Sequence, residues 1–339
     1  MLKPYIAQVV ERRDLSETQC QEAMGLIMSG QATEAQIAAF IIALRMKGET
    51  VEEITGCARA MRAAATRIET GGLPVVDTCG TGGDEKRTFN VSTVAALVAA
   101  GAGVPVAKHG NRSVSSSSGS ADVLTALGVN LDVAPEVVSE CIRKVGIGFL
   151  FAVKLHPAMK YAIGPRREVG QRTVFNILGP LTNPAGARRQ LLGVFSEALV
   201  ETLAGVLLRL GAEKAMVVHS ADGLDELSVS DESFVAEVDG GEVTSWRLTP
   251  ESVGLPRSPL EELIVEDVGE GAEAIRDVLA GRTGPRRDIA LLNAGAAIYV
   301  GGKVNSVGEG VGAATDSIDS GSARRTLEGL VELTTRSAS

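Results

Sequence analysis

A glycine-rich turn between an apolar run and a helical pattern is the first feature of the sequence that could do chemistry. Gly80, Gly82 and Gly83 lie within four positions, directly after the apolar run 73–79. Glycine accepts positive φ and lets a ligand approach the backbone N–H groups without meeting a Cβ atom. A helix start is expected near residues 90–93, where free N–H groups and the helix dipole attract anions. The segment therefore predicts a phosphate site, although a turn without a ligand has the same local pattern.

A lysine and a row of serines follow the next apolar run along the chain. Lys108, His109, Asn111 and Arg112 precede the serine-rich stretch 113–120. Because loops at the carboxyl ends of adjacent parallel strands converge on one crevice, we expect these side chains to face the glycine-rich turn. A lysine with hydroxyl and N–H groups suits a second phosphate, and a flexible serine linker is the alternative. The histidine suits either acid–base chemistry or packing, because the sequence identifies no carboxylate partner for it.

Three carboxylates gather in a short turn after the apolar run 215–220. They belong to Asp222, Asp225 and Glu226, and a glycine between them allows the turn. Mg²⁺ takes one or two carboxylates from a protein and leaves its other positions to water and substrate phosphates. If such a cluster stood without other binding features nearby, we would interpret it as a solvated acidic turn. Beside two anion-binding loops on the same sheet, the cluster predicts a magnesium site.

Arginines in the segment 156–190 offer a second kind of ligand recognition. Arg166, Arg167 and Arg172 lie there among prolines. A guanidinium group can bind a carboxylate through two parallel hydrogen bonds, which a lysine cannot do. A solvated basic surface is the alternative interpretation. The prolines predict an irregular connection with short helices, so the segment is a candidate hinge or crossing between domains.

The residues before this chemistry show only helical patterns. Apolar residues recur at helical spacing within residues 1–70, and three capping motifs mark helix starts, at Ser16-x-x-Gln19, Thr33-x-x-Gln36 and Thr50-x-x-Glu53. This part of the chain predicts an antiparallel helical bundle.

From residue 73 onward the pattern changes to apolar strands punctuated by glycine and followed by amphipathic helices. The first part of this pattern has apolar segments at 73–79 and 104–108, with helices expected at 91–103 and 121–127. Further segments of the pattern are 215–220, 233–248 and 288–302. Alternating strands and helices predict an α/β fold with a mainly parallel sheet. The segment 233–248 is the exception, because a Gly-Gly turn between two strands predicts an antiparallel hairpin at the sheet edge.

Composition restricts the class of protein. With 339 residues, 45% of them hydrophobic, the chain has enough apolar surface for a globular fold with two domains. A formal net charge of -9 argues against nucleic-acid binding, which needs a basic surface. The four cysteines show no metal-ligand spacing, so we expect a reduced, cytoplasmic setting. No apolar run is long enough to span a membrane, so we expect no membrane partner.

Longer motifs connect these features to one family. The chain contains, in this order, DTCGTGGD, NVST, KHGNRSVSSSSGSADVL, HPAMK, GQRTVFNILGPLTNPA and DGLDE. In these motifs, and over nearly its whole length, it resembles the anthranilate phosphoribosyltransferases of the nucleoside-phosphorylase-like group. The resemblance implies transfer of the 5-phosphoribosyl group from 5-phosphoribosyl 1-pyrophosphate (PRPP) to the amine of anthranilate. Pyrophosphate is released in this reaction, which belongs to tryptophan biosynthesis.

The resemblance also implies an architecture, a cofactor and an assembly. It implies a small helical domain of residues 1–70, to which part of 165–190 returns. The remaining residues, 73–339, would form a larger α/β domain with a mainly parallel sheet. Mg²⁺ is the implied cofactor, and the implied assembly is a homodimer formed through the helical domains.

By motif match, the ligand-binding residues of the family carry over to this sequence. The resemblance implies that PRPP, the donor, is held by Gly80, Thr81, Gly82, Gly83, Asp84, Thr88, Asn90, Ser92, Thr93, Lys108 and Ser120. It implies an acceptor site for anthranilate at Gly80, His109, Asn111, His156 and Arg166. It implies that Mg²⁺ is supported by Ser92, Asp225 and Glu226. No catalytic residue follows with certainty, because a neutral aromatic amine needs little activation and preorganised hydrogen-bond donors can stabilise the departing pyrophosphate.

Two rival functions share parts of this pattern. A pyrimidine-nucleoside phosphorylase would have the same fold with the glycine and serine loops, but inorganic phosphate would attack a nucleoside. A non-enzymatic relative that binds nucleic acid would need a basic surface, which the net charge opposes.

Overall fold

The N-terminal part of the protein is helical. A computed structural model describes residues 1–84, 86–112 and 119–336. The first helices are α1 (Lys3–Val10), α2 (Glu17–Met28), α3 (Glu34–Lys47) and α4 (Val51–Ala64). Ser16 and Thr50 form reciprocal capping boxes, and the Thr33 hydroxyl accepts a hydrogen bond from the Gln36 N–H. The three predicted helix starts are confirmed, and the helices pack as the pairs α2 with α4 and α1 with α3.

The rest of the chain is built on a seven-stranded sheet. The strands are β1 (Val76–Gly80), β2 (Val106–Gly110), β3 (Ile147–Phe151), β4 (Arg189–Gly193), β5 (Lys214–Ser220), β6 (Ser233–Asp239) and β7 (Glu242–Leu248). Their order is β3-β2-β1-β4-β5-β6-β7. All pairs from β3 to β5 are parallel, whereas β6 and β7 are antiparallel to their neighbours. The predicted α/β class, the mainly parallel sheet and the edge hairpin are confirmed.

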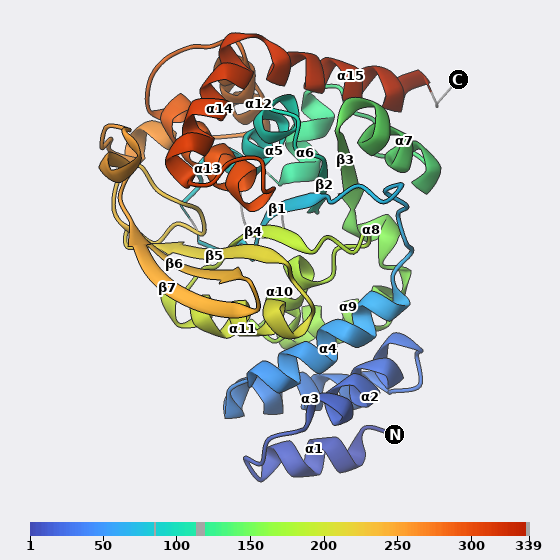
Figure 1. The fold of residues 1–339 in the computed structure, drawn as a ribbon. Coiled ribbons are helices and arrows are strands. Elements are labelled where there is room, and N and C mark those ends of the chain that lie inside the picture. The colour runs from blue at the N-terminus through green and yellow to red at the C-terminus, as the bar shows by residue number, and fades with distance from the viewer. Residues whose placement is uncertain (85, 113–118, 337–339) are drawn as a thin grey trace.

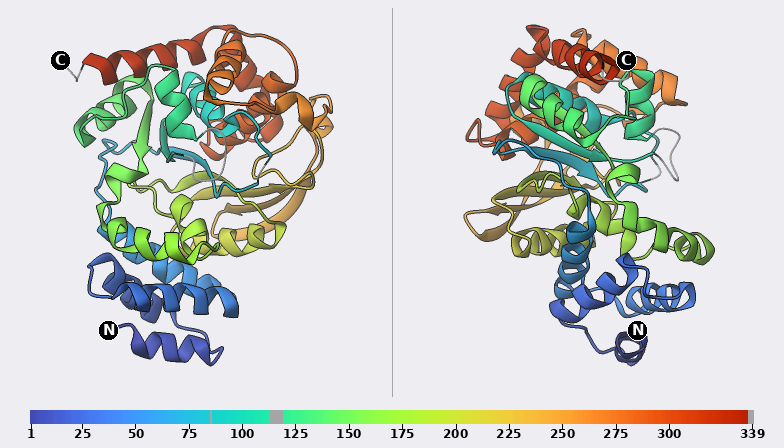
Figure 2. Two further views of the ribbon diagram at one scale, coloured as in Figure 1. Left: turned by 180° about the vertical axis from the view of Figure 1, so that it is seen from behind. Right: turned by 90° about the vertical axis from the view of Figure 1, so that its right-hand side faces the viewer.

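Helices cover both faces of the sheet (Figures 1 and 2). One face carries α5 (Val91–Gly101), α6 (Ser120–Ala126), α12 (Val268–Leu279), α13 (Pro285–Val300), α14 (Val307–Asp319) and α15 (Ser322–Arg336). The opposite face, on the side of the helical part, carries α10 (Phe175–Leu178) and α11 (Val200–Arg209). Successive side chains of a strand point to opposite faces of the sheet, so each strand contributes to both cores. In β4, Leu191 packs in the core on the first face and Leu192 in the core on the second. Helix α7 (Pro135–Val145) packs against β3.

The segment between β3 and β4 is more regular than its prolines suggest. It contains α8 (Ala152–Leu155) and α9 (Lys160–Val169), and the second helix continues through Pro165 although proline removes one main-chain hydrogen bond. α9 packs against α3 and α2, so part of the crossing lies on the helical part. The boundaries of the two domains at residues 70 and 73 stay a prediction.

Other segments differ from the sequence pattern or were absent from it. β3 and β4 were not predicted: the apolar run of β3 is too short to have a period that separates strand from helix, and β4 begins with the polar residues Arg189 and Gln190. The segment 288–302, part of the alternating pattern, lies almost entirely in α13.

Candidate functional site

The strand order reverses between β1 and β4, and the candidate residues gather at this point. In open α/β sheets the crevice beyond the carboxyl ends of the strands, where the order reverses, is the usual ligand site. The glycine-rich turn follows β1, Lys108 and His109 lie at the end of β2, and the acidic turn follows β5. The structure therefore brings together three segments that are far apart in the sequence.

The glycine-rich turn has the backbone that its composition predicts. Gly82 and Gly83 have φ values of 66° and 84°, a region that L-residues with side chains rarely adopt. Gly80 has no room for a side chain either, because a Cβ atom there would lie 2.6 Å from Asp225 Oδ2. The Gly82 N–H donates a hydrogen bond of 2.8 Å to the same oxygen. The turn is thus closed against the acidic turn that follows β5.

Two of the three acidic side chains point into the site. Asp225 is buried, and burial together with nearby Asp84 raises its pKa to about 7. Burial and the charge of Asp225 raise the pKa of Glu226, whose Oε1 accepts a hydrogen bond of 3.2 Å from the Ser92 N–H. Asp222 instead accepts bonds from the Leu224 N–H and the Ser228 hydroxyl, which stabilise the turn.

The start of α5 faces the two carboxylates. Asn90 is the N-cap residue but makes no capping hydrogen bond through its side chain. Thr93 is buried, and its hydroxyl has no hydrogen-bond partner among residues 1–84, 86–112 and 119–336. The ammonium group of Lys108 donates to Thr78 O at 2.5 Å and to Ser92 Oγ at 3.1 Å. Burial lowers the pKa of this lysine, while the charge of Asp77 opposes that shift.

The remaining donor candidates have contacts of their own. Thr81 is fixed to the end of β4, since its N–H donates to Gly193 O at 2.9 Å. Thr88 forms an isolated bridge with Ile264. Ser120 begins α6, and its hydroxyl donates to the backbone oxygen of exposed Asn111 at 3.3 Å. The serines at 113–118 lie outside the described residues, so their predicted part in a second phosphate site stays a prediction.

Two histidines form a buried pair beside the donor candidates. The Nε2 atoms of His109 and His156 are 3.2 Å apart. Burial, with the second histidine adding to it, lowers the pKa of His109 to about 3, and burial lowers the pKa of His156 to about 4. Both rings are therefore neutral at pH 7. The sequence left open whether His109 is an acid–base group or a packed residue; its partner turns out to be another histidine.

The three arginines of the crossing have different environments. Arg166 is half-buried on α9 and stacks over the Phe175 ring at 5.1 Å. Burial lowers its pKa, and it forms no ion pair with another residue of the described ranges. Arg167 is exposed. Arg172 reaches the glycine-rich turn, where its Nη2 atom donates to Gly83 O at 2.6 Å.

Comparison of the sequence with known proteins identifies the family of the chain. Models of the glycosyl transferase family match the helical bundle domain at residues 3–65 and the a/b domain at residues 72–324. The chain is 56% identical to the anthranilate phosphoribosyltransferase of Thioalkalivibrio sulfidiphilus over 98% of both chains. The chain belongs to the anthranilate phosphoribosyltransferase family.

Solved structures of this family have the same fold. The enzyme from Thermus thermophilus is 46% identical and superposes with a TM-score of 0.93, covering 97% of this chain and 99% of its own. The Saccharomyces cerevisiae enzyme in complex with PRPP and Mg is 28% identical with a TM-score of 0.89, covering 99% and 98%. The yeast enzyme has also been solved with 4-fluoroanthranilate.

Two buried polar residues at the site were not singled out from the sequence. Asp77 Oδ1 accepts a hydrogen bond of 3.0 Å from the His109 N–H, and Oδ2 accepts one of 2.8 Å from Asn183 Nδ2. Burial raises the pKa of Asp77 to about 6. A carboxylate inside an otherwise apolar strand was the available signal, because such a group needs buried partners. Asn183 had no comparable signal among the turns of the crossing.

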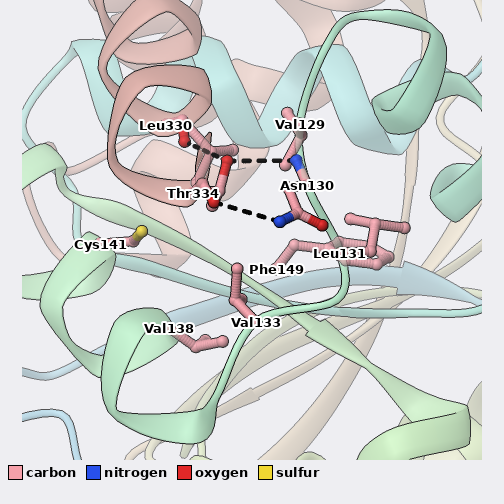
Figure 3. Close-up of a pocket in the computed structure, with 9 residues that line it drawn as sticks. All are labelled: Val129, Asn130, Leu131, Val133, Val138, Cys141, Phe149, Leu330 and Thr334. Atoms are coloured by element: carbon pink, nitrogen blue, oxygen red, sulfur yellow. Dashed lines mark hydrogen bonds between the residues drawn. The ribbon is translucent and has the colours of Figure 1, made fainter. Parts of the chain in front are cut away.

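Hollows elsewhere in the molecule are not lined by these residues. A pocket of about 10 Å³ between α7, β3 and α15 has room for one water and is crossed by hydrogen bonds between Asn130 and Thr334 (Figure 3). A wider groove lies over β6 and β7 beside the start of α11. Within the described ranges, no cluster of three or more metal-ligating His, Cys, Asp or Glu side chains occurs, and every helix is too short or too polar to cross a membrane.

Proposed function

We propose that this protein is an anthranilate phosphoribosyltransferase, which transfers the phosphoribosyl group of PRPP to the amine of anthranilate and releases pyrophosphate. One observation carries the proposal: a glycine-rich loop, a helix start and two carboxylates converge at the end of β1. The names of the relatives and the PRPP, Mg and 4-fluoroanthranilate complexes of the yeast enzyme support it.

The donor binds at the glycine-rich turn and the start of α5. The residues are those implied by the motifs: Gly80, Thr81, Gly82, Gly83, Asp84, Thr88, Asn90, Ser92, Thr93, Lys108 and Ser120. The buried Thr93 hydroxyl has no partner among the described residues, so a phosphate can accept a hydrogen bond from it, and the positive end of the α5 dipole favours an anion at the same place. The positive φ values of the turn support the approach of pyrophosphate to its N–H groups.

Mg²⁺ fits the pair of carboxylates, with the Ser92 hydroxyl beside them. Asp225 and Glu226 are oxygen ligands whose pKa values are raised by burial and by a neighbouring carboxylate, Asp84 for Asp225 and Asp225 for Glu226, and a divalent cation would offset both effects. Mg²⁺ in enzymes is usually bound by one or two protein carboxylates, and substrate phosphates and water occupy its other positions. The two carboxylates here fit that pattern. When bound, the ion neutralises charge on the departing pyrophosphate.

The acceptor lies between the histidine pair and α9, with Gly80 and Asn111 at its edge. Arg166 binds the anthranilate carboxylate, which is supported by its burial and its lack of an ionic partner among the described residues. The neutral imidazoles of His109 and His156 offer a nitrogen to the amine without adding positive charge. We assign them to orienting the acceptor.

The chain's own groups then account for the transfer. Breaking the C1–O bond leaves positive charge on the ribose and negative charge on the departing pyrophosphate. The N–H groups of the turn and the Lys108 ammonium stabilise the negative charge because they are already oriented. The neutral amine attacks C1 as the C1–O bond breaks, and the proton that the amine nitrogen then loses passes to the released pyrophosphate or to water. Because both substrates must be held in contact for this attack, positioning supplies much of the rate.

The cellular setting and the assembly belong to the same proposal. The four cysteines are buried and unpaired, which supports the cytoplasm. Exposed apolar side chains on mutually packed helices support a homodimer through the helical part; they include Val10 of α1, Met46 of α3, and Tyr161 and Ile163 of α9. The acidic net charge supports the expectation that nucleic acid is not a partner.

Anthranilate fluorescence provides the direct test. With purified protein, PRPP and Mg²⁺, we expect the fluorescence of anthranilate to fall with time, and no change when either addition is omitted. Phosphate-dependent release of free base from a pyrimidine nucleoside, with stable anthranilate fluorescence, would replace the proposal with the phosphorylase reaction.

The double variant Asp225→Asn with Glu226→Gln tests the metal assignment. We expect the Mg²⁺ concentration for half-maximal rate to rise by at least about tenfold, because both charged ligands are lost. The melting temperature should not fall, since neutral amides avoid the cost of burying two charges. An unchanged Mg²⁺ dependence would make the turn structural only.

A further inference from the structure

Arg172 connects the crossing segment to the glycine-rich turn in a way that no role proposed above explains. It follows α9 and lies half-buried before α10. Its Nη2 atom donates a hydrogen bond of 2.6 Å to Gly83 O, and its guanidinium carbon lies 4.4 Å from the centre of the Phe195 ring. The side chain is therefore oriented by an aromatic face and directed at one peptide of the turn.

Holding this carbonyl fixes the direction of the next N–H group. The peptide between Gly83 and Asp84 is planar and trans, so its C=O and N–H point in opposite directions. A carbonyl bound by Arg172 thus directs the Asp84 N–H away from the arginine. A Cβ atom on Gly83 would lie 2.6 Å from Nη2, so the close approach of the guanidinium depends on glycine at this position.

The same strand end that supports Arg172 also fixes the beginning of the turn. The Phe195 N–H donates to Thr81 Oγ1 at 3.1 Å, and the Thr81 N–H donates to Gly193 O at 2.9 Å. The end of β4 thus holds Thr81 directly and holds Gly83 through Arg172. Gly82 lies between these two attachments and is bound to Asp225.

We propose that Arg172 is a positioning residue of the donor site, which acts through Gly83 to hold the turn 80–84 in its PRPP-binding conformation. The inference rests on the proposed function, because it takes this turn as the donor loop. The loop's glycines lower its steric constraints, so contacts from outside must select one conformation. A planar group stacked on Phe195 selects a single direction, which a flexible ammonium does not.

Titration calorimetry of the full-length protein with PRPP and Mg²⁺ tests this role. For Arg172→Met we expect the donor Kd and the donor KM to rise by about tenfold, because the variant loses the charge-assisted hydrogen bond to Gly83 O. The KM for anthranilate and the melting temperature should stay close to those of the wild type. The donor Kd of Arg172→Lys should lie between those of the wild type and Arg172→Met, because lysine keeps the positive charge but cannot stack a planar group on Phe195. Exposed Arg167→Met is the matched control and should leave donor binding unchanged.

Gly82→Val separates this inference from the proposed function. A β-branched residue opposes the φ of 66°, so this variant should lose donor binding if the turn is the donor loop. Ordinary PRPP affinity in folded Gly82→Val would refute the donor loop itself. Lost affinity in Gly82→Val with wild-type affinity in Arg172→Met would overturn only the inference about Arg172. Equal losses for both substrates, with a lower melting temperature, would also overturn it in favour of a general structural role.

Discussion

The two adjacent arginines of α9 have different environments. Arg166 is half-buried over Phe175, whereas Arg167 is exposed. If Arg166 binds the carboxylate of anthranilate, Arg166→Ala should raise the anthranilate KM by roughly 10- to 150-fold, from a charge-assisted bond of ~1.5–3 kcal/mol. The donor KM should change little. Steady-state kinetics with each substrate varied in turn measures both values.

Arg167→Ala is the control, because consecutive helical residues point in different directions. It should leave both KM values near the wild-type values. A larger anthranilate defect in this variant would show that the wrong arginine was assigned, and equal defects for both substrates in Arg166→Ala would indicate a role outside the acceptor site.

The buried histidine pair predicts a particular pH dependence of stability. The pKa values of about 3 and about 4 lie below the ordinary value of about 6.5, so between pH 4 and 6.5 the unfolded chain binds protons that the folded chain does not. The stabilising contribution is complete above pH 6.5 and is lost as the pH falls toward the folded values. Each histidine changes the free energy of unfolding by up to about 1.4 kcal/mol per pH unit in this range.

Urea unfolding at pH 7.5 and 5.5 checks this dependence against His156→Gln. The wild type should lose about 1 kcal/mol more than the variant between the two pH values. The comparison removes the contribution of Asp77, whose raised pKa acts in the opposite direction. Identical losses in both proteins would mean that His156 is protonated in the folded state at pH 5.5.

At the scale of single elements, the start of α5 combines a stable helix with an unused hydroxyl. Thr93 is 1% exposed, and its Oγ1 atom has no partner among the described residues. Thr93→Val keeps the shape and removes the hydroxyl, so it should leave the melting temperature unchanged or raise it. The donor KM should nevertheless increase, because the hydroxyl is assigned to the PRPP phosphate. Differential scanning calorimetry and donor kinetics measure the two effects.

Thr78→Val is the matched control for this helix start. Thr78 is equally buried, but its hydroxyl donates to Ser92 O at 3.0 Å. Losing this bond should cost about 1 kcal/mol of stability. If Thr93→Val lowered stability as much as Thr78→Val and left donor kinetics unchanged, its hydroxyl would have a structural partner.

The elements themselves differed in how well the sequence predicted them. Helix starts with a capping motif were predicted to the residue, because Ser16 or Thr50 satisfies N–H groups only at that position. The hairpin was predicted because the Gly-Gly turn specifies its geometry. β3 and β4 were missed, since their identity as strands comes from their neighbours in the sheet, and α9 continues through Pro165 because it packs on α3 and α2.

The site followed the same division between local and distant causes. The positive φ of Gly82 and Gly83 is a local property, and the sequence predicted it. The contact of Asp225 with this turn required the sheet order, because 143 residues separate Gly82 from Asp225. The pairing of His109 with His156 depends on how the crossing folds back, which no short pattern encodes.

At the scale of the whole molecule, exposed apolar side chains on the helical part predict the assembly. Val10, Met46 and Ile163 are 66%, 72% and 47% exposed, and they lie on helices that pack together. Such side chains on neighbouring elements are typical of an interface. We expect light scattering after size exclusion to give a mass of roughly twice 35.1 kDa for the wild type, as a C2 homodimer requires.

The double variant Met46→Glu with Ile163→Glu should shift this mass to that of the monomer, because two buried charges per subunit oppose association. Val153→Glu is the matched control: Val153 is 62% exposed but lies on α8, in the segment that follows β3. This variant should keep the dimer mass. Both variants should stay folded, since each substituted side chain is already in contact with solvent in the single chain, and the monomeric variant should melt at a lower temperature only by the amount that association stabilises the dimer. A dimer that survives the double substitution but dissociates in Val153→Glu would place the interface on the α/β part, against the arrangement proposed from the helical surface.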